Sequence, residues 1–288
     1  MTRLGLILTF LGFIFFACNS SHQQEQNQEQ EEHSKGALFI IGGGSRPAEL
    51  VERMINESGL REGGYAVVLP MSSSLPDSAI IWSSEQFVNA GITSITGFNF
   101  LPGETPDSSR IDSLKNASLI YISGGDQNQF MSVVADTDIE RAIHTAWQNG
   151  AMIAGTSAGA AVMSKQMITG NELRYPDYTA TFRTIESENL ELARGLGFLT
   201  SAIIDQHFIW RSRHNRLFTA VIENPELMGI GIDESTAILV RGNQAEVIGS
   251  AQVMVFSNPD RSFFEQNNKL GARNLKIDIH LSGEKFDL

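Results

Sequence analysis

Short apolar runs that end in glycine or proline recur along this chain, and amphipathic segments of helical length separate them. The runs ALFIIGGG, YAVVLP, SLIYISGG and AMIAG are continuously apolar, as strands buried on both faces are. Between them, PAELVERMINESGL and ADTDIERAIHTAWQNG space their apolar residues as helices do. This alternation predicts an α/β fold: a doubly wound, mostly parallel sheet flanked by helices, with the ligand site at the carboxyl ends of the strands.

The alternation of strand-like and helix-like segments ends at about Asn224. Residues 229–257 and 274–288 are patterned as strands joined by tight turns, one of them at Gly242 and Asn243. We expect these strands to form an antiparallel C-terminal extension of the same sheet. No internal repeat or linker interrupts residues 36–288, so one domain is expected there.

The first 17 residues are typical of an export signal. Arg3 precedes an apolar run from Leu4 to Ala17 that is too short to span a bilayer. The sequence FFAC resembles a bacterial lipobox, which predicts cleavage before Cys18, lipidation of Cys18 and attachment to the membrane of the cell envelope. A plain signal peptide is the alternative. Residues 18–35 hold almost no apolar side chain and predict a disordered tether.

Charge and cysteine content narrow the function further. The formal net charge is -12 and the isoelectric point is near 4.9, which argues against a nucleic-acid partner. Cys18 is the only cysteine, so an intrachain disulfide, a thiol nucleophile and a zinc cluster are not expected. We predict no metal and no cofactor, and the sequence is compatible with a homodimer.

A nucleophile is predicted at Ser157. The motif GTSAG, residues 155–159, lies between the apolar strand AMIA and the small-residue run AGAAVMSKQM. This is the context of a nucleophile elbow, a sharp strand-to-helix turn that exposes the serine. In the plainer interpretation, Ser157 only caps the helix.

An exposed serine also needs hydrogen-bond donors for an oxyanion. The amide of Ala158 is the natural first donor because it begins the helix. In the loop SGGDQ, residues 123–127, either Gly124 or Gly125 brings a second amide close without a side chain in the way, and we favour Gly125. An ordinary tight turn is the alternative for this loop.

Two histidines are candidates for the general base. His207 follows the apolar strand SAIID, so it leaves a sheet at the end where a base reaches the serine. His280 fits the chain order of an α/β-hydrolase-type esterase, with Asp205 or Asp233 as the orienting acid. We favour His207, because His280 lies within an alternating strand pattern that accounts for a half-exposed histidine.

The motif GTSAGAAVM, the upstream GGDQ, and DQHF followed by three arginines together resemble the cyanophycinases, serine peptidases related to peptidase E. The segment GIGIDESTA, residues 229–237, also resembles that family. The resemblance covers about residues 36–288. It implies a fold similar to the class I glutamine amidotransferase-like or flavodoxin-like proteins, with Ser157 as nucleophile and His207 as general base.

The resemblance also implies a substrate. Cyanophycinases are exopeptidases that cut cyanophycin, a polyaspartate whose side chains each carry arginine through an isopeptide bond, into β-Asp-Arg dipeptides. Guanidinium groups match the free α-carboxylates of such a polymer, and Asp205 is the expected partner of its guanidinium groups. The residues at positions that match the family's substrate pocket are Gln127, Asp205, Gln206, Arg211, Arg213 and Arg216. Alternatively, the arginines form a solvated helical face.

The acid that orients His207 is also placed by the resemblance. In the family it lies soon after the serine helix, and Glu172 has the most similar spacing, with Asp177 and Glu186 as alternatives. The sequence thus predicts a lipid-anchored serine peptidase acting on cyanophycin or on other aspartyl or isoaspartyl peptides. A peptidase E-like dipeptidase, the esterase above and a non-catalytic peptide-binding lipoprotein are the alternative functions.

Overall fold

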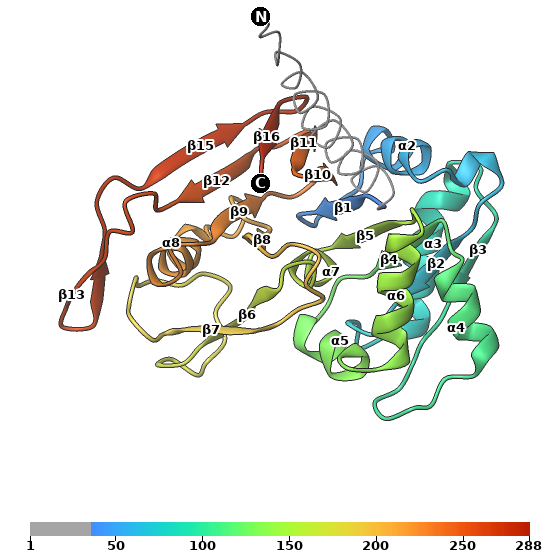
Figure 1. Cartoon of the computed structure of the whole chain (residues 1–288), viewed down its shortest axis with the longest axis horizontal. Coiled ribbons are helices and arrows are strands. Elements are labelled where there is room, and N and C mark those ends of the chain that lie inside the picture. Colours follow the sequence, from blue (N-terminus) through green and yellow to red (C-terminus); the bar gives the residue numbers. More distant parts are fainter. Residues whose placement is uncertain (1–35) are drawn as a thin grey trace, which may run out of the picture.

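The computed structural model describes residues 36–288. The signal, the lipidation site and the tether expected in residues 1–35 lie outside this range. The first half of the described chain consists of β1 (Leu38–Ile41), α2 (Ala48–Glu57), a 3-10 turn (Leu60–Glu62), β2 (Ala66–Leu69), α3 (Pro76–Asn89), β3 (Ile95–Gly97), α4 (Ser108–Lys115), β4 (Leu119–Ile122), α5 (Gln127–Val134), α6 (Asp138–Gln148) and β5 (Met152–Thr156) (Figure 1).

The second half has shorter helices and more strands. It consists of α7 (Ala158–Ala161), β6 (Gln166–Glu172), β7 (Leu190–Arg194), β8 (Ala202–Gln206), α8 (His214–Glu223), β9 (Met228–Ile232), β10 (Thr236–Arg241), β11 (Gln244–Gly249), β12 (Val253–Ser257), β13 (Phe264–Gln266), β14 (Lys269–Gly271), β15 (Lys276–His280) and β16 (Lys285–Asp287).

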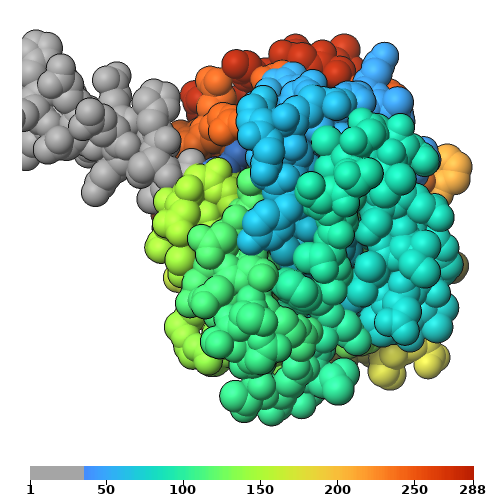
Figure 2. Space-filling view, turned by 90° about the vertical axis from the view of Figure 1, so that its right-hand side faces the viewer, coloured from blue at the N-terminus to red at the C-terminus, as the bar shows by residue number. Residues whose placement is uncertain are grey.

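The large sheet has eight strands in the order β16-β11-β10-β1-β5-β4-β2-β3, and the five strands from β1 to β3 are parallel. Alternation along β1 sends Leu38 and Ile40 into one core, under α4, α5 and α6. Phe39 and Ile41 point into a second core on the other face, under α2 and α3. Helices therefore cover both faces, which confirms the predicted doubly wound α/β fold. Figure 2 shows the end of the molecule that the first half of the chain forms.

The antiparallel extension is divided between two sheets, which corrects the expectation of one. Strands β10, β11 and β16 extend the large sheet beyond β1 in antiparallel fashion. Strands β9, β12 and β15 instead join β8 in a second sheet of order β15-β12-β9-β8. The physical reason is that β1 already pairs with β5 on one side and with β10 on the other. Strands β8 and β9 therefore cannot pair with β1, and they form a separate sheet.

Carboxyl ends of strands from both sheets meet at one place. The amide of His207, directly after β8, donates to the carbonyl of Gly42, directly after β1, over 2.7 Å. Strands β4 and β5 of the large sheet and β9 of the second sheet end at the same side, because each is parallel to its neighbour there. This junction is where the sequence places its candidate side chains.

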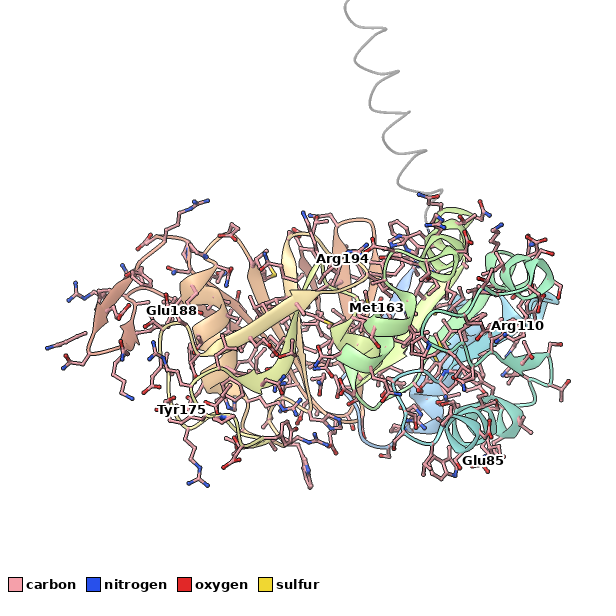
Figure 3. All side chains as sticks on the ribbon, turned by 90° about the horizontal axis from the view of Figure 1, so that it is seen from below. Glu85, Arg110, Met163, Tyr175, Glu188 and Arg194 are labelled. Atoms are coloured by element: carbon pink, nitrogen blue, oxygen red, sulfur yellow. The ribbon has the colours of Figure 1, made fainter. Side chains whose placement is uncertain are left out.

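The molecule is elongated. The loop between β6 and β7 reaches the junction, where its Tyr178 lies near Ser157. In Figure 3, Tyr175 and Glu188 lie at the end opposite to Glu85 and Arg110. Within residues 36–288, no helix is both long and apolar enough to cross a bilayer.

Candidate active site

Ser157 stands on the turn between β5 and α7 with φ 54° and ψ -110°, a backbone conformation that non-glycine residues rarely adopt. Two glycines make this turn possible. A Cβ atom on Gly155 would lie 2.2 Å from the carbonyl oxygen of Gly159, and one on Gly159 would lie 2.3 Å from that of Ile122. The helix that follows is only one turn long, ending at Ala161. The geometry is that of a nucleophile elbow.

His207 is the histidine that meets this serine. Its Nε2 lies 2.9 Å from Ser157 Oγ, so the hydroxyl donates to the ring when Nδ1 carries the proton. The rival candidate, His280, lies on β15 and stacks on Phe286 at a ring-centroid distance of 4.8 Å. The structure therefore brings together Ser157 and His207, and leaves His280 elsewhere.

The carboxylate beside His207 belongs to Glu234. Its Oε1 lies 2.5 Å from His207 Nδ1, and it follows β9, the parallel neighbour of β8. A carboxylate in this place fixes the tautomer in which Nε2 accepts the serine proton. Serine, histidine and glutamate thus form a continuous hydrogen-bonded chain.

This arrangement corrects the expectation of Glu172. The Glu172 carboxylate lies on the β6–β7 hairpin, where it accepts hydrogen bonds from Asn189 at 2.8 Å and from Thr179 at 3.5 Å. The two alternatives are also elsewhere: Glu186 pairs with Lys269, and Asp177 is exposed. The spacing of Glu172 from the serine helix resembles that of the family's acid, but Glu172 does not lie beside the imidazole of His207.

A glycine loop holds the imidazole and the glutamate. Gly43, with φ 119°, faces the ring so closely that a Cβ atom there would lie 2.3 Å from His207 Cε1. A Cβ atom on Gly44 would lie 2.7 Å from Glu234 Cβ. The loop after β1 therefore needs glycine to let His207 and Glu234 approach. Two sequence signals for this contact were present: the GGG run at 42–44 and the acidic pair Asp233-Glu234 at the end of β9.

Burial is the largest cause that lowers the pKa of His207 below its ordinary value of 6.5. Positive charge on Arg211 and Arg213 lowers it further, whereas the hydrogen bond that His207 donates to Glu234 raises it. The net direction is downward, so the imidazole is neutral at neutral pH. A neutral ring at 2.9 Å from the hydroxyl is able to take its proton.

The three arginines differ in their surroundings. Arg216 is fully buried, and it binds Asp205 through two nitrogens, with Nε at 2.7 Å from Oδ2. Arg213 is also buried and donates to the carbonyl of Gln206 at 2.8 Å and to its side-chain oxygen. Burial, followed by repulsion from Arg216, lowers the pKa of Arg213 to about 10, which leaves it charged at neutral pH. Arg211 is half-buried and makes no ion pair with any residue of the described range.

Asp205 has a different position from the one expected. Its side chain is fully buried beneath the arginines and does not line the cavity in front of Ser157. Both of its oxygens are engaged by Arg216. Asp205 therefore holds Arg216 in place and does not face a ligand guanidinium.

A cavity of about 250 Å³ opens in front of Ser157 and contains most of the predicted residues. Three guanidinium groups lie around two carboxylates, the buried Asp205 and Asp126 in the lining, so positive charge exceeds negative charge at this cavity of an acidic protein. Its lining residues are Gly125, Asp126, Gln127, Asn128, Ser157, Thr169, Gly170, Asn171, Tyr178, Gln206, Arg211, Arg213 and Arg216.

Comparison with known proteins identifies the family of this chain. The model of Peptidase family S51 matches residues 38–248. The chain belongs to peptidase family S51. It is accordingly a serine-type peptidase, as the sequence predicts.

Several curated relatives resemble this peptidase. The cyanophycinase of Nostoc sp. is 30% identical over 88% of this chain and 86% of its own length. That of Synechococcus elongatus is 28% identical over 89% and 81%. Peptidase E of Actinobacillus pleuropneumoniae is 27% identical over 51% and 60%. A solved peptidase from an acI-B1 Actinobacterium has the same fold, with a TM-score of 0.65 and 22% identity over 90% of this chain and all of that one.

Two glycines of the peptidase lie beside Ser157 on the side of β4. A Cβ atom on Gly124 would lie 3.3 Å from Ser157 Cβ, and one on Gly125 would lie 1.9 Å from the carbonyl oxygen of Ser72. Gly125 has φ 142°, so this close passage requires glycine. Asp126 begins α5 by accepting the amide of Asn128 at 2.7 Å, which fixes the loop.

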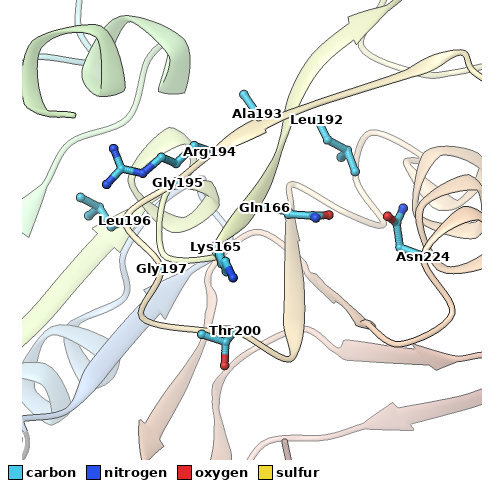
Figure 4. A pocket seen from close by; sticks show the side chains of 10 residues that line it. All are labelled: Lys165, Gln166, Leu192, Ala193, Arg194, Gly195, Leu196, Gly197, Thr200 and Asn224. Atoms are coloured by element: carbon cyan, nitrogen blue, oxygen red, sulfur yellow. The ribbon is translucent and has the colours of Figure 1, made fainter. Parts of the chain in front are cut away.

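Gln127 and Tyr178 also line the cavity in front of Ser157. The Gln127 amide donates to the carbonyls of Ile168 and Thr169 at 2.8 and 2.7 Å, which ties α5 to β6. A separate cavity, of about 720 Å³, is lined by residues of β6 and β7 together with Lys165 and Asn224 (Figure 4). It contains none of the residues named for catalysis. Sequence reasoning did not single out Tyr178, because an aromatic residue in a polar loop carries no motif.

Proposed function

We propose that this peptidase hydrolyses aspartyl-linked amides in cyanophycin or in closely related arginyl-aspartyl peptides through an acyl-enzyme on Ser157. The observation that carries the proposal is the hydrogen-bonded set of Ser157, His207 and Glu234 at the mouth of an arginine-lined cavity. The cyanophycinase relatives support the same choice of substrate.

The reaction follows from the positions of these atoms. Ser157 Oγ attacks the aspartyl carbonyl carbon while its proton passes to His207 Nε2. Glu234 stabilises the resulting imidazolium, and the amides of Gly125 and Ala158 are the donors proposed for the oxyanion. His207 then gives the proton to the leaving amine as the carbon–nitrogen bond breaks. Water, activated by the same imidazole, hydrolyses the ester and restores Ser157.

Recognition is assigned to the cavity arginines. Each repeat of cyanophycin offers a free α-carboxylate on its arginyl group, and guanidinium groups bind carboxylates through paired hydrogen bonds. Arg211 is half-buried and free of an ion pair within the described chain, so it is the arginine best placed to bind a carboxylate that enters. Arg213 and Arg216 supply charge from below.

The direct test is product analysis. Incubation of the purified protein with cyanophycin is expected to release β-Asp-Arg dipeptides, with little hydrolysis of polyaspartate that lacks arginine. Isoaspartyl dipeptides serve as the second substrate, because relatives named peptidase E match half of the chain. Cleavage of the dipeptides but not of cyanophycin would replace the proposed substrate by that of a dipeptidase.

The Arg211→Gln variant is expected to lower kcat/KM for cyanophycin by about 10- to 100-fold, the size of a lost hydrogen bond to a charged group. The same change removes a positive charge that lowers the pKa of His207, so the acidic limb of the pH–kcat/KM profile should move to higher pH. Arg46, on the α2 side of the molecule, provides the matched control as Arg46→Gln. If Arg211→Gln changes neither kcat/KM nor the acidic limb of the pH profile, Arg211 does not bind the substrate.

We also propose that the mature protein is held at the cell envelope by a lipid on Cys18, with residues 18–35 as its tether. The support is the lipobox-like sequence before the only cysteine. The protein should then partition with membranes, and Cys18→Ala should release it into the soluble fraction. If that variant stays with the membranes, the proposed lipid on Cys18 is wrong, and the protein is held by a different anchor or by an uncleaved signal.

A further inference from the structure

A loop without helix or strand, residues 173–189, joins β6 to β7 and reaches the cavity in front of Ser157 through Tyr178. Long loops of this kind are uncommon in compact domains, and they are usually functional. This one is attached at two places. It contacts the arginines of the cavity, and it contacts the hairpin of β13 and β14, which projects from the same end of the molecule (Figure 1).

The first attachment joins the loop to two arginines of the cavity. Thr181 Oγ1 donates to the carbonyl oxygen of Arg211 over 2.6 Å. The carbonyl oxygen of Ala180 accepts a hydrogen bond from Arg213 Nε over 3.4 Å. Both arginines line the cavity, so the loop helps to fix their positions there.

Phe182 brings the third arginine into this contact. Its ring is buried, and the ring centroid lies 5.9 Å from the guanidinium carbon of Arg216. Its carbonyl oxygen accepts from Asn215 Nδ2 at 2.9 Å. Residues 180–182 are uncharged. The loop therefore holds the arginines without cancelling the positive charge that attracts a carboxylate.

The second attachment is a pair of backbone hydrogen bonds to the β13–β14 hairpin. The amide of Ser187 donates to the carbonyl oxygen of Asn268 at 2.9 Å, and the amide of Leu270 donates to that of Ile185 at 3.1 Å. The hairpin is closed by a two-residue turn at Asn267 and Asn268, both with positive φ, a turn that matches the twist of its strands. The loop thus adds a short antiparallel segment to this hairpin.

Glu186 and Lys269 stand opposite each other between these two hydrogen bonds. Their side chains form an ion pair. Tyr175 Oη, from the other end of the loop, donates to the same carboxylate over 2.9 Å. Glu186 is 5% exposed, so its carboxylate is largely removed from water and relies on these two partners. The cluster of Tyr175, Glu186 and Lys269 therefore ties both ends of the loop to the hairpin.

We propose that the β13–β14 hairpin positions the cavity arginines for the carboxylates of the substrate, acting through the loop between β6 and β7. Glu186 and Lys269 are the positioning residues where hairpin and loop meet. The inference rests on the proposed function, because it concerns how the same cavity binds its substrate. Within residues 36–288, no hydrogen bond joins this loop to the side chain of Ser157 or His207. Release of the loop should therefore weaken substrate binding and leave the catalytic hydrogen bonds intact.

A reversible disulfide between loop and hairpin tests the proposal. In the chain produced from residue 18 with Cys18→Ala, the changes Glu186→Cys and Lys269→Cys introduce the only two cysteines. Opposed residues that lie between two ladder hydrogen bonds have Cα atoms about 4.5 Å apart, which a disulfide can bridge. Oxidation joins the loop to the hairpin, and reduction of the same protein releases it.

We expect the KM for soluble cyanophycin to be about tenfold higher in the reduced protein than in the oxidised one, with kcat nearly unchanged. A change in KM alone is the sign of lost substrate binding, and its size is that of one weakened hydrogen bond to a charged group. The oxidised protein should have the KM of the parent.

The pH profile of Ser157 labelling by a neutral phosphonate is a readout that needs no substrate. Positive charge on Arg211 and Arg213 lowers the pKa of His207, so arginines that move away from the ring let that pKa rise. The acidic limb of the labelling profile should then lie at higher pH in the reduced protein, with equal labelling rates at alkaline pH in both states.

Single variants provide the controls. Glu186→Cys alone and Lys269→Cys alone should not respond to the reductant, and both should resemble the reduced double variant. Lys269→Arg retains the ion pair and should keep the KM of the parent, whereas Lys269→Met should raise it.

The inference is overturned if neither KM nor the labelling profile responds to reduction, or if Lys269→Arg and Lys269→Met behave alike. A fall in the alkaline labelling rate on reduction would also overturn it, because the hairpin would then support the catalytic residues as well. If the parent does not cleave cyanophycin, the proposed function fails, and the labelling profile of Ser157 still decides whether the hairpin positions the arginines.

Discussion

The Ser157→Ala variant is expected to lose essentially all hydrolysis of aspartyl peptides, with kcat falling on the order of 10⁵- to 10⁶-fold. The serine hydroxyl is the nucleophile of the proposed mechanism, and it lies 2.9 Å from the imidazole nitrogen that would take its proton. Alanine fits the same strained turn, since the neighbouring glycines already relieve the crowding. The thermal unfolding midpoint should therefore stay close to that of the parent.

Two comparisons make this loss specific. Ser132→Ala, at an exposed serine of α5, should retain full activity, and His207→Ala should lose nearly as much as Ser157→Ala. The double variant should be no worse than either single one, because the residues act as one unit. Activity lost in His280→Ala but kept in His207→Ala would instead indicate the esterase mechanism.

A serine-reactive phosphonate separates an enzyme from a binder that only retains the pocket. A mass increase on the peptide containing Ser157, absent from Ser157→Ala, is the expected result. Binding of cyanophycin without any adduct would identify a peptide-binding protein and would contradict the proposed catalysis.

The Glu234→Gln variant is the second large effect, with kcat expected to fall by about 10⁴-fold, as happens when the orienting acid of a serine triad is neutralised. Glu234 holds the proton of His207 on Nδ1 over 2.5 Å, so an amide there permits the wrong tautomer and no longer stabilises the imidazolium. The effect should appear in kcat and much less in KM, because the carboxylate does not line the cavity.

Glu172→Gln is the matched control. Its carboxylate binds Asn189 and Thr179 on the hairpin, so its loss should leave kcat near the parent value. Should Glu172→Gln lose thousands-fold activity while Glu234→Gln remains active, the acid would have to be reassigned to Glu172.

The sequence predicts the parts of this site that depend on local patterns. Ser157 was recognisable because strand, sharp turn and small-residue helix are contiguous, and His207 because it directly follows an apolar strand. The parallel sheet was predictable for the same reason, since each buried strand is followed by its own helix.

Long-range contacts were less accessible. Glu234 reaches His207 because β9 pairs with β8 in a register that places Ile232 opposite Gln206. The hydrophobic periodicity of a segment does not predict which strand it pairs with. Asp205 illustrates a second limit. A carboxylate beside three arginines in sequence serves equally well as a ligand contact or as a buried counter-ion, and only its burial distinguishes the two.

The division of the site between two sheets has a consequence for biosynthesis. The nucleophile directly follows β5 of the large sheet, but its base and the acid that orients the base come from the second sheet, fifty and seventy-seven residues later in synthesis. A polypeptide emerging from the ribosome therefore carries Ser157 before the base that takes its proton has been made. The hydrogen-bonded set therefore forms only after β8 and β9 have been made and the second sheet has packed against the first.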